Sequence, residues 1–512
     1  MSANIPSYPV LTCSEAKAWE SSVLKDEAQE WAAMMEAGAR LAQAVLEDFR
    51  EIGGLPPAAG ILVLAGKGHN GGDALLAARE ILARHPDATA TVVLCFGAGE
   101  LRPLAGRALD RLKADAPGRV QLMAVAKALD ESRSYALCLD GIFGFQFRPP
   151  MAGPVADLLA AVNAHPAIKL RAAVDLPSGV GEHSAATAFR ADFTYATGIV
   201  KYPVLHARQV NAVGRLRFLN LGLMRAEAAP AAHERMLTGE LLAPLAGLRP
   251  PQTDKRTYGH LVVVGGSRSY PGAVLLAVRA ALRSGVGLVT AVVPAQLAPE
   301  YAARHPEAMW VGGAENDAGG LDVSCLPAVR ERMARASALL IGPGLGSAEH
   351  TIAFAARLAG EAQVPVVLDA DALRREVFAP AREKTFIATP HAGEFQRIAP
   401  VLFSDGRFTA PRGVLVLKGP MTRVTDGHTI YHSPFGGPVL ARGGSGDVLA
   451  GLIGGLLAQA ADDPVLAACR GVVWHGHAAD LLARARGQVS VETTQLLEQL
   501  GPALTPDPWQ IH

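Results

Sequence analysis

The sequence has little of several features that would assign it to a particular class of protein. Its 512 residues include only five cysteines, which are scattered along the chain, odd in number and without Cys-x-x-Cys spacing. A disulfide framework or a zinc site is therefore not expected, and the composition suits a reducing cytoplasm. The formal net charge is +0, so the chain has no basic surplus that would indicate binding to nucleic acid or to an anionic membrane.

Signals for secretion and for membrane insertion are missing as well. Residues 1–10 have neither a basic region nor an apolar core, so no signal peptide is expected. No apolar run reaches about 18 residues, roughly the length that a membrane-spanning helix needs. What the chain does have is 50% hydrophobic and 19% charged residues, enough to bury large cores, and a length that predicts two or three domains.

A glycine-rich segment in the C-terminal half is the strongest single signal. Residues 441–447 read ARGGSGD and run into an apolar stretch, residues 448–459, that predicts a helix. Glycine lets the backbone approach a ligand closely, and the free N–H groups at a helix start bind anions. Asp447 lies where these N–H groups converge, so its carboxylate is placed to take a proton or to steer a metal ion. A glycine-rich helix start can also serve close packing alone, and that alternative stays open.

Four segments upstream of this loop are apolar runs that end in glycine or polar residues. They cover residues 341–346, 365–373, 389–395 and 414–419. In a doubly wound sheet the carboxyl ends of the strands gather at one edge, and ligands bind there. The pattern predicts one cleft that collects Gly344, Asp369, His391, Lys418 and Asp447.

The N-terminal half carries a second glycine-rich loop. Residues 61–65 form a continuous apolar run, as expected for a parallel strand buried on both faces, and lead into GKGHNGGD at residues 66–73 and a predicted helix over 74–84. The loop is neither a Walker loop nor a Gly-x-Gly-x-x-Gly fingerprint, but strand, glycine-rich turn and helix together favour a phosphate site. Asn70 and Asp73 offer oxygens that suit a hard cation or ribose hydroxyls. The alternative is a tight packing turn.

Aspartates also end further predicted strands of this half. Asp140 closes a strand over residues 135–140, and Asp175 closes one over residues 172–175. Strands that alternate with helices predict an α/β sandwich with a mostly parallel sheet. A single aspartate at a strand end is often only a helix cap, whereas three in one sheet, with Asp73 as the third, favour a site.

A stretch rich in alanine and proline, residues 223–259, reads as the linker between the halves. We therefore expect two domains, residues 1–228 and 229–512, each with a mostly parallel sheet flanked by helices.

Further motifs in the C-terminal half narrow the comparison. They are VVGGS at 263–267, YPGA at 270–273, LRSGVGLVT at 282–290 and HPE at 305–307. Together with the segments above, they resemble the ribokinase-like superfamily and, more closely, the C-terminal half of the bifunctional NAD(P)H-hydrate repair enzymes. The resemblance covers roughly residues 250–505. It implies a ribokinase-like fold and an ADP-dependent dehydratase.

The N-terminal half resembles the epimerase half of the same enzymes over roughly residues 10–225. The matching motifs are MEAG at 35–38, NGGD at 70–73, Asp140 with Phe143 and Gly144, Asp175 with PSG at 177–179, and Lys201. The resemblance implies a Rossmann-like three-layer sandwich. It departs from the family pattern at His69, Ala74, Phe145 and Gln146, where the family usually has Asn, Gly, a small residue and Gly, so the loops here are stiffer and bulkier.

The resemblance also implies the residues of the epimerase site. A potassium ion is implied near the oxygens of Asn70, Asp140 and Ser178, and Asp175 is implied as the base. The implied substrate contacts are His69, Asn70, Gly71, Gly72, Asp73, Gly144, Phe145, Gln146, Phe147, Arg148, Pro149, Pro150 and Asp175.

For the dehydratase site the resemblance implies Asp447 as the catalytic base. The implied nucleotide contacts are Lys418, Gly419, Pro420, Met421, Thr422 and Gly446. The implied pocket for the hydrate consists of Ala273, Gly344, His391 and Asp447. Mg²⁺ is implied together with the nucleotide.

The implied function is repair of damaged nicotinamide cofactors. The damaged forms, NADHX and NADPHX, are hydrates with a hydroxyl group at C6 of the nicotinamide ring. The N-terminal domain would interconvert their R and S epimers. The C-terminal domain would convert the S form to NAD(P)H, with ADP converted to AMP and phosphate. We expect a homo-oligomer, because helices rich in alanine and glycine suit contacts between subunits.

Two other functions stay open at this stage. A ribokinase-like kinase for a vitamin alcohol or a sugar would share the Asp447 loop but would give no role to the N-terminal half. The N-terminal domain could instead be a nucleotide-binding scaffold without catalysis, because Phe145 and Gln146 replace small residues.

Overall fold

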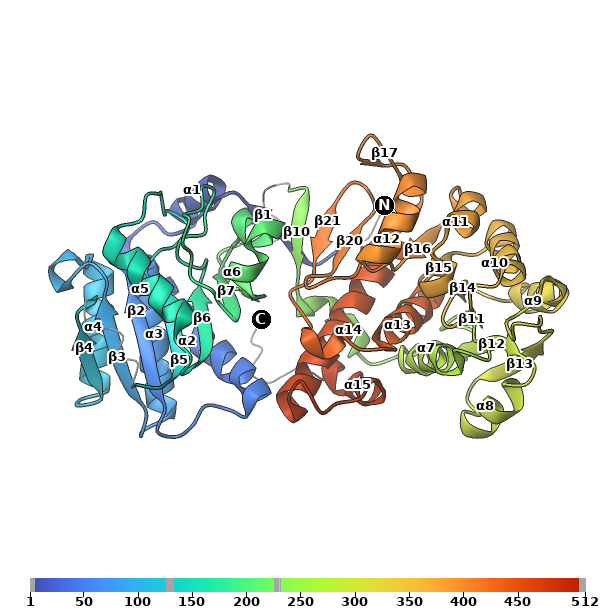
Figure 1. Ribbon diagram of the computed structural model, residues 1–512, viewed down its shortest axis with the longest axis horizontal. Coiled ribbons are helices and arrows are strands. Elements are labelled where there is room, and N and C mark those ends of the chain that lie inside the picture. The colour runs from blue at the N-terminus through green and yellow to red at the C-terminus, as the bar shows by residue number, and fades with distance from the viewer. Residues whose placement is uncertain (1–4, 126–132, 225–229, 231, 506–512) are drawn as a thin grey trace. The chain divides into compact units, whose positions relative to one another are not determined.

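The computed structural model describes residues 5–125, 133–224, 230 and 232–505, which pack as two compact units (Figure 1). The N-terminal unit consists of the described residues of 8–232 together with 483–488. The C-terminal unit consists of the described residues of 1–7, 233–482 and 489–512. The described residues before Tyr8 therefore belong to the C-terminal unit, and residues 483–488 belong to the N-terminal unit. A single boundary between residues 228 and 229 does not include these two segments.

The N-terminal unit is built on a seven-stranded sheet in which all neighbouring strands are parallel. In spatial order its strands are β4 (Val120–Met123), β3 (Thr89–Leu94), β2 (Gly60–Ala65), β5 (Tyr135–Gly141), β6 (Ile168–Val174), β7 (Phe193–Thr197) and β9 (Arg215–Leu219). Its helices are α1 (Cys13–Val23), α2 (Glu27–Phe49), α3 (His69–Arg84), α4 (Pro103–Asp115), α5 (Gly153–Ala164) and α6 (Val210–Val213). A two-residue strand, β8 (Val200–Lys201), pairs with β1 (Ser7–Leu11).

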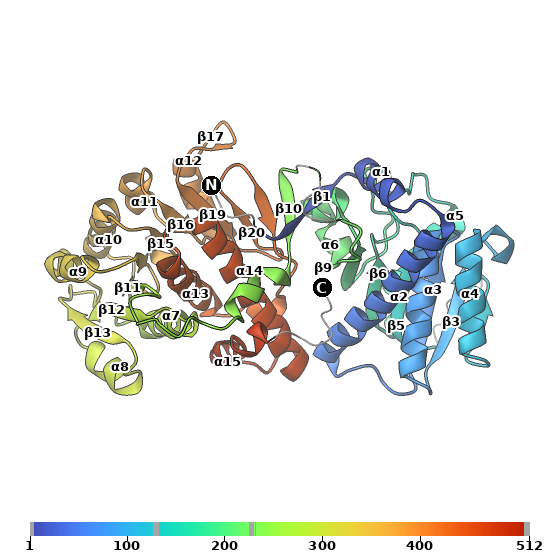
Figure 2. The same cartoon turned by 180° about the vertical axis from the view of Figure 1, so that it is seen from behind.

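Both faces of this sheet are covered by helices, which explains why the central strand β2 is apolar throughout. Ile61 and Val63 of β2 pack into the core under α2, α3 and α4, on the face seen in Figure 2. The alternate residues Leu62 and Leu64 pack into the core under α5, on the face seen in Figure 1. The predicted three-layer α/β arrangement is confirmed.

The C-terminal unit has a mostly parallel sheet, as predicted. Its parallel strands are β13 (Met309–Gly313), β12 (Leu288–Pro294), β11 (His260–Val264), β14 (Ala338–Ile341), β15 (Val366–Leu368), β16 (Phe386–Ala388) and β19 (Gly413–Leu417). The antiparallel strands β20 (Arg423–Thr425) and β21 (Ile430–His432) follow, and β10 (Glu234–Leu237) pairs with β21 in parallel. A separate hairpin joins β17 (Phe403–Ser404) and β18 (Arg407–Phe408).

The helices of this unit are α7 (Pro271–Arg283), α8 (Ala298–Arg304), α9 (Leu326–Met333), α10 (Glu349–Glu361), α11 (Arg375–Ala381), α12 (Ala392–Leu402), α13 (Ser445–Gln459), α14 (Pro464–Arg486, whose last residues belong to the N-terminal unit) and α15 (Thr493–Gln499). Close packing of α13 on α7 requires glycine, because a Cβ at Gly451 would clash with the carbonyl of Ala277. No helix in the described part of the chain is long and apolar enough to span a bilayer.

Two expectations about element boundaries were wrong. Helix α3 begins at His69, not at residue 74, so the glycine-rich motif forms its first turns. Glycine disfavours helices, but here a Cβ at Gly71 or Gly72 would meet the backbone of Gly66 or the side chain of Met34. The stretch 223–259 is not only a linker, because β10 lies within it and adds a strand to the C-terminal sheet.

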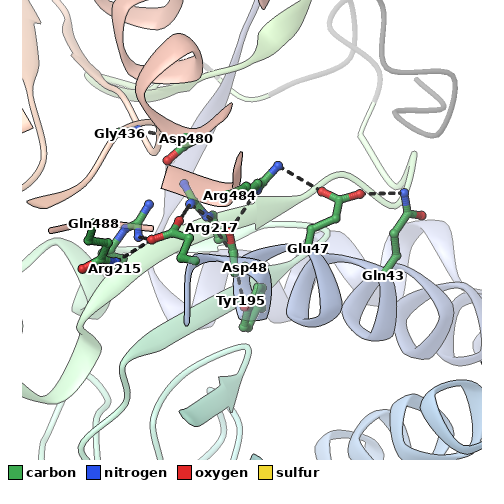
Figure 3. A network of polar contacts seen from close by, with 11 residues as sticks. Gln43, Glu47, Asp48, Tyr195, Arg215, Arg217, Gly436, Asp480, Arg484 and Gln488 are labelled. Atoms are coloured by element: carbon green, nitrogen blue, oxygen red, sulfur yellow. Dashed lines mark hydrogen bonds and ion pairs between the residues drawn. The ribbon is translucent and has the colours of Figure 1, made fainter. Parts of the chain in front are cut away.

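A buried carboxylate anchors residues 483–488 to the N-terminal unit (Figure 3). Asp48 of α2 accepts hydrogen bonds from Tyr195 (3.1 Å), from two nitrogens of Arg217 (both 3.0 Å) and from Arg484 (2.9 Å). Burial disfavours the charged carboxylate, but the two arginines outweigh it and lower the pKa of Asp48 to about 2. Gln488 adds a hydrogen bond to Glu51 (2.5 Å).

We expect Arg484→Met to destabilise the N-terminal unit by about 1.5–3 kcal/mol, the usual contribution of a hydrogen bond to a charged group. Hydrogen exchange of the α2 amides should become faster in the variant. Arg486→Met is the matched control, because Arg486 is exposed and lies two residues further along the same helix. Equal exchange of α2 in the two variants would show that the Arg484 contact contributes nothing.

Candidate functional site

In the C-terminal unit, three neighbouring parallel strands end at the same edge of the sheet and place polar residues side by side. Asp369 follows β15, Thr389 follows β16 and Lys418 follows β19. The Lys418 Nζ lies 3.1 Å from Asp369 Oδ1, and the Thr389 hydroxyl donates to the same oxygen at 2.7 Å. The predicted meeting of Asp369 and Lys418 is therefore seen in the structure.

His391 and Glu394 complete this edge at the start of α12. The His391 Nδ1 accepts hydrogen bonds from the amides of Gly393 and Glu394, and Glu394 Oε2 accepts one from the His391 amide at 2.8 Å. The same Glu394 oxygen lies 3.8 Å from Lys418 Nζ. The sequence analysis predicted His391 in the cleft but did not predict Glu394. Glu394 follows His391 at the spacing of a capping box.

Asp447 lies in the first turn of α13, at the end of the glycine-rich loop. The residue before the helix, Gly444, is left-handed (φ +88°) and offers no side chain to cap the helix. A Cβ at Gly446 would lie 3.2 Å from Lys418 Nζ, so the lysine sits against the helix start. This combination of open amides and an ammonium group suits an anion such as a phosphoryl group.

The electrostatics of this edge suit a base. Burial and the neighbouring carboxylate of Asp369 raise the pKa of Asp447 to about 7, against the effect of Lys418. For Lys418, burial disfavours the charge, but Asp369 and Glu394 outweigh it and raise its pKa. A carboxyl with a pKa near neutrality both accepts and releases protons at physiological pH.

The remaining predicted residues lie on adjoining segments. Gly344 is left-handed (φ +62°) and packs against Tyr270 and Ala273, so any side chain there would collide with α7. Residues 419–422 form the turn between β19 and β20 that directly follows Lys418. Behind the loop, His475 contacts the carbonyl of Ser445 (3.0 Å), and burial lowers the pKa of His475 to about 4, so this imidazole is neutral and supports the start of α13.

The N-terminal unit contains a cavity of about 370 Å³ at the carboxyl ends of its strands. Of the predicted substrate contacts, those that line it are His69, Asn70, Asp73, Gly144, Phe145, Gln146, Phe147, Arg148 and Asp175. Those that do not are Gly71, Gly72, Pro149 and Pro150. The first two are buried within the packing of α3, for the steric reason given above.

A chain of hydrogen bonds connects the three predicted cation ligands. The Asn70 amide donates to the carbonyl of Phe143 (2.8 Å), whose own N–H donates to Ser178 Oγ (2.9 Å). Ser178 in turn donates its hydroxyl and its backbone N–H to Asp140, at 2.6 and 2.7 Å. Burial raises the pKa of Asp140 to about 6, against the effect of these hydrogen bonds. A cation beside this carboxylate would relieve the cost of burying it.

Asp175 follows β6 in a left-handed conformation (φ +63°) that L-residues rarely adopt. Its Oδ1 accepts hydrogen bonds from Lys201 Nζ at 2.7 Å and from the amide and hydroxyl of Thr197 at 3.4 and 3.3 Å. The lysine also lies 3.7 Å from Glu20 Oε1 and 5.0 Å from the centre of the Phe145 ring. Strain of this kind concentrates at functional sites.

Glu20 is one of the residues lining this cavity that the sequence analysis did not predict. It lies in α1, which is far along the chain from the strands that end at the cavity, and it belongs to no motif. The helix is anchored by a capping box at Thr12 and by a hydrogen bond from Trp19 to the carbonyl of Leu223 (2.9 Å). Only the folded chain brings Glu20 to Lys201.

Among the described residues, no cluster of three or more His, Cys, Asp or Glu side chains has the arrangement of a metal site.

Comparison with known families assigns both halves of the chain. The family model described as NAD(P)H-hydrate dehydratase matches residues 261–502, and the model described as YjeF-related protein N-terminus matches residues 31–202. A solved ADP/ATP-dependent NAD(P)H-hydrate dehydratase from Bacillus subtilis, co-crystallised with ATP and Mg²⁺, is 28% identical; the match covers 52% of this chain and 96% of that chain at a TM-score of 0.41.

Curated relatives match along nearly the whole chain. The bifunctional NAD(P)H-hydrate repair enzyme Nnr of Gloeobacter violaceus is 38% identical, and the match covers 93% of this chain and 94% of that protein. The enzyme of the same name from Escherichia coli is 32% identical, with 88% of this chain and 86% of that protein covered. The resemblance indicated by the sequence motifs is confirmed, and the chain belongs to the family of bifunctional NAD(P)H-hydrate repair enzymes.

Proposed function

We propose that the chain repairs hydrated nicotinamide cofactors with two active sites. The C-terminal domain, residues 229–512, dehydrates S-NADHX and S-NADPHX and converts ADP to AMP and phosphate. The N-terminal domain, residues 1–228, interconverts the R and S epimers and thereby supplies the dehydratase. The observation that carries the proposal is Asp447, a carboxyl with a pKa of about 7 in the first turn of a glycine-rich helix beside Lys418.

The proposed dehydration overcomes the fact that hydroxide is a poor leaving group. The C6 hydroxyl gives its proton to Asp447 and attacks the terminal phosphoryl group of ADP, which releases AMP. The lone pair of ring nitrogen N1 then expels phosphate, and loss of a proton from C5 restores the double bond of NAD(P)H. The amides of residues 444–446 would stabilise the charge on the transferring phosphoryl group.

The other proposed dehydratase contacts fall into two groups. Lys418, Gly419, Pro420, Met421, Thr422 and Gly446 would hold the nucleotide, and Ala273, Gly344 and His391 would line the hydrate pocket. Mg²⁺ would neutralise the ADP phosphates. Asp369 and Glu394 offer it carboxylate oxygens, which are the ligands that this ion prefers.

In the epimerase domain, we propose Asp175 as the base and Asn70, Asp140 and Ser178 as the ligands of K⁺. The oxygen donors of these three residues, linked by the hydrogen bonds described above, fit a hard cation. The cavity-lining residues would contact the substrate. We further propose that the enzyme works as a cytosolic homo-oligomer.

A small-molecule kinase would use the same loop, but it leaves the epimerase cavity without a role. Membership of the repair family favours the repair function over that alternative. The two are separated by giving the protein mixed R- and S-NADHX with ADP, with ATP or with neither. We expect the absorbance of the reduced nicotinamide to recover fully with a nucleotide and not without one. Recovery of the S fraction alone would mean that the N-terminal domain is a scaffold, and no recovery would overturn the proposal.

Asp447→Asn should lower the dehydration rate by about 100-fold or more, because the amide cannot accept the hydroxyl proton. Exchange of R and S epimers should continue at the wild-type rate, since it takes place in the other domain. Asp462→Asn, an exposed aspartate of the same unit, serves as the control and should keep both activities. Comparable loss of both activities in Asp447→Asn would contradict the two-site proposal.

The pH dependence of dehydration should follow Asp447. Its pKa is raised to about 7, so the group loses its basic form as the pH falls through that value. We expect kcat/KM for the S hydrate to fall about tenfold per pH unit below roughly pH 7 and to level off above it. The measurement must subtract the spontaneous, acid-promoted loss of the hydrate. A profile that is flat from about pH 6 to 8 would exclude Asp447 as the base.

A further inference from the structure

Asp73 presents a carboxyl group to the epimerase cavity without any partner. It lies at the start of α3 and lines the cavity with Asp175, Lys201 and Glu20. Among the described residues, none donates a hydrogen bond to it or forms an ion pair with it. Asp175, by contrast, accepts three hydrogen bonds, from Lys201 and Thr197. The two carboxyls of one cavity therefore have opposite surroundings.

Asp73 shares its part of the cavity with two other carboxyls and one ammonium. Asp73, Asp175, Glu20 and Lys201 would together carry a net charge of −2 if all were ionised, which is costly for groups with little access to water. Asp175 has the Lys201 ammonium and the two Thr197 donors within hydrogen-bond distance. Burial raises the pKa of Asp73 well above its usual range, and Asp175 and Glu20 raise it further against the effect of Lys201. The hydrogen-bond donors of this cluster thus lie on Asp175, and the raised pKa of Asp73 lets it keep its proton to higher pH than an ordinary aspartate.

The candidate site of the C-terminal unit has a similar arrangement of a lysine between two acids, on a different backbone. Lys418 lies between an aspartate that follows a strand (3.1 Å) and a glutamate from a helix (3.8 Å), as Lys201 does at 2.7 and 3.7 Å. In both units an additional carboxyl near a helix start has its pKa raised by burial and by these two acids. In the C-terminal unit that carboxyl is Asp447, to which we have given a proton-transfer role.

Inversion at C6 of the hydrate needs both an acid and a base, because one bond to C6 must break and form again from the other side. We propose that Asp73 is the general acid of epimerisation and works with Asp175 as the base, while Lys201, which holds Asp175, and Glu20, which lies beside Lys201, are positioning residues. This inference rests on the proposed epimerase activity of the N-terminal domain.

The step balances without any further reactant. Asp175 takes the proton of the C6 hydroxyl, the carbonyl forms at C6, and the C6–N1 bond breaks as Asp73 gives its proton to N1. Rotation about the C5–C6 bond turns the aldehyde over. The reverse transfers then close the ring on the other face, with Asp73 regaining its proton from N1 and Asp175 returning its proton to the oxygen.

Other ionisable side chains line the same cavity and can influence its titration. They are Glu30, Lys67, His69, Arg102 and Arg148. His69 lies 3.5 Å from Glu30, so these two groups are in contact with each other. A pH profile therefore identifies Asp73 only when wild type and variants are compared.

The test is the rate of R/S exchange, followed by chromatography of the two NADHX epimers in the full-length protein without nucleotide. The rate is measured from about pH 6 to 10, and the spontaneous rate is subtracted. For the wild type we expect the rate to fall at alkaline pH as the acid loses its proton. Asp73→Asn should exchange at least about 100-fold more slowly and lack the alkaline fall, with little change in KM. Asp73→Glu should recover part of the rate and the alkaline fall.

Glu20→Gln gives a second, independent readout. Ionised Glu20 raises the pKa of Asp73, so its removal should move the alkaline fall to lower pH without abolishing exchange. Asp110→Asn, an exposed position on α4, is the matched control and should leave the profile unchanged.

The outcomes separate this inference from the proposed function on which it rests. If wild-type protein does not exchange the epimers, the epimerase activity itself is wrong. If it does, an Asp73→Asn profile that keeps the wild-type rate or the alkaline fall, or a Glu20→Gln profile that does not move, overturns the role of Asp73.

Discussion

Each site contains a lysine held between two acids, and the charges of these three groups shift the pKa of a neighbouring carboxyl. The lysine nitrogen lies 2.7 Å from an aspartate and 3.7 Å from a glutamate for Lys201, and 3.1 and 3.8 Å for Lys418. A lysine in such surroundings stays charged only because the acids compensate for its lost hydration. Because each cluster already has two acids for one ammonium, a third carboxyl close to it is disfavoured in its charged form, and its pKa is raised. Asp73 and Asp447 occupy that position.

The parallel sheets make these clusters possible. Each aspartate of a lysine pair directly follows a strand, Asp175 after β6 and Asp369 after β15, and the carboxyl ends of parallel strands meet at one edge. The titrating carboxyl comes instead from a helix, and its glutamate neighbour from another helix. Loss of the lysine would leave buried acids unpaired, which costs more than the ion pair itself contributes. Structural stability and the proposed proton transfer would therefore depend on the same contacts.

Most of this architecture could be predicted from the sequence, because the signals for it are local. Apolar runs ending in aspartate predicted the strand edges, and the glycine-rich loop predicted the start of α13. Prediction from the sequence failed where the cause of a structural feature lies in distant parts of the chain. The beginning of α3 at His69 depends on contacts that forbid side chains at Gly71 and Gly72. Glu20 reaches the cavity, and residues 483–488 join the N-terminal unit, only through the folded chain, which leaves no pattern in composition or spacing.

Similar clusters can serve different reactions because the backbone around them differs. At Asp447 the helix start has a left-handed glycine cap and Lys418 beside it, so a phosphoryl group can approach the carboxyl. In the N-terminal unit the glycines at the start of α3 are buried in packing, and the oxygen groups of Asp140 and Ser178 lie at the same strand edge. That arrangement suits a cation rather than a phosphate. In the mechanisms proposed above, a carboxyl with a raised pKa transfers a proton in both sites. Among the described residues of the two sites, the helix start at Asp447 is the one that suits the phosphoryl group of a second substrate such as ADP.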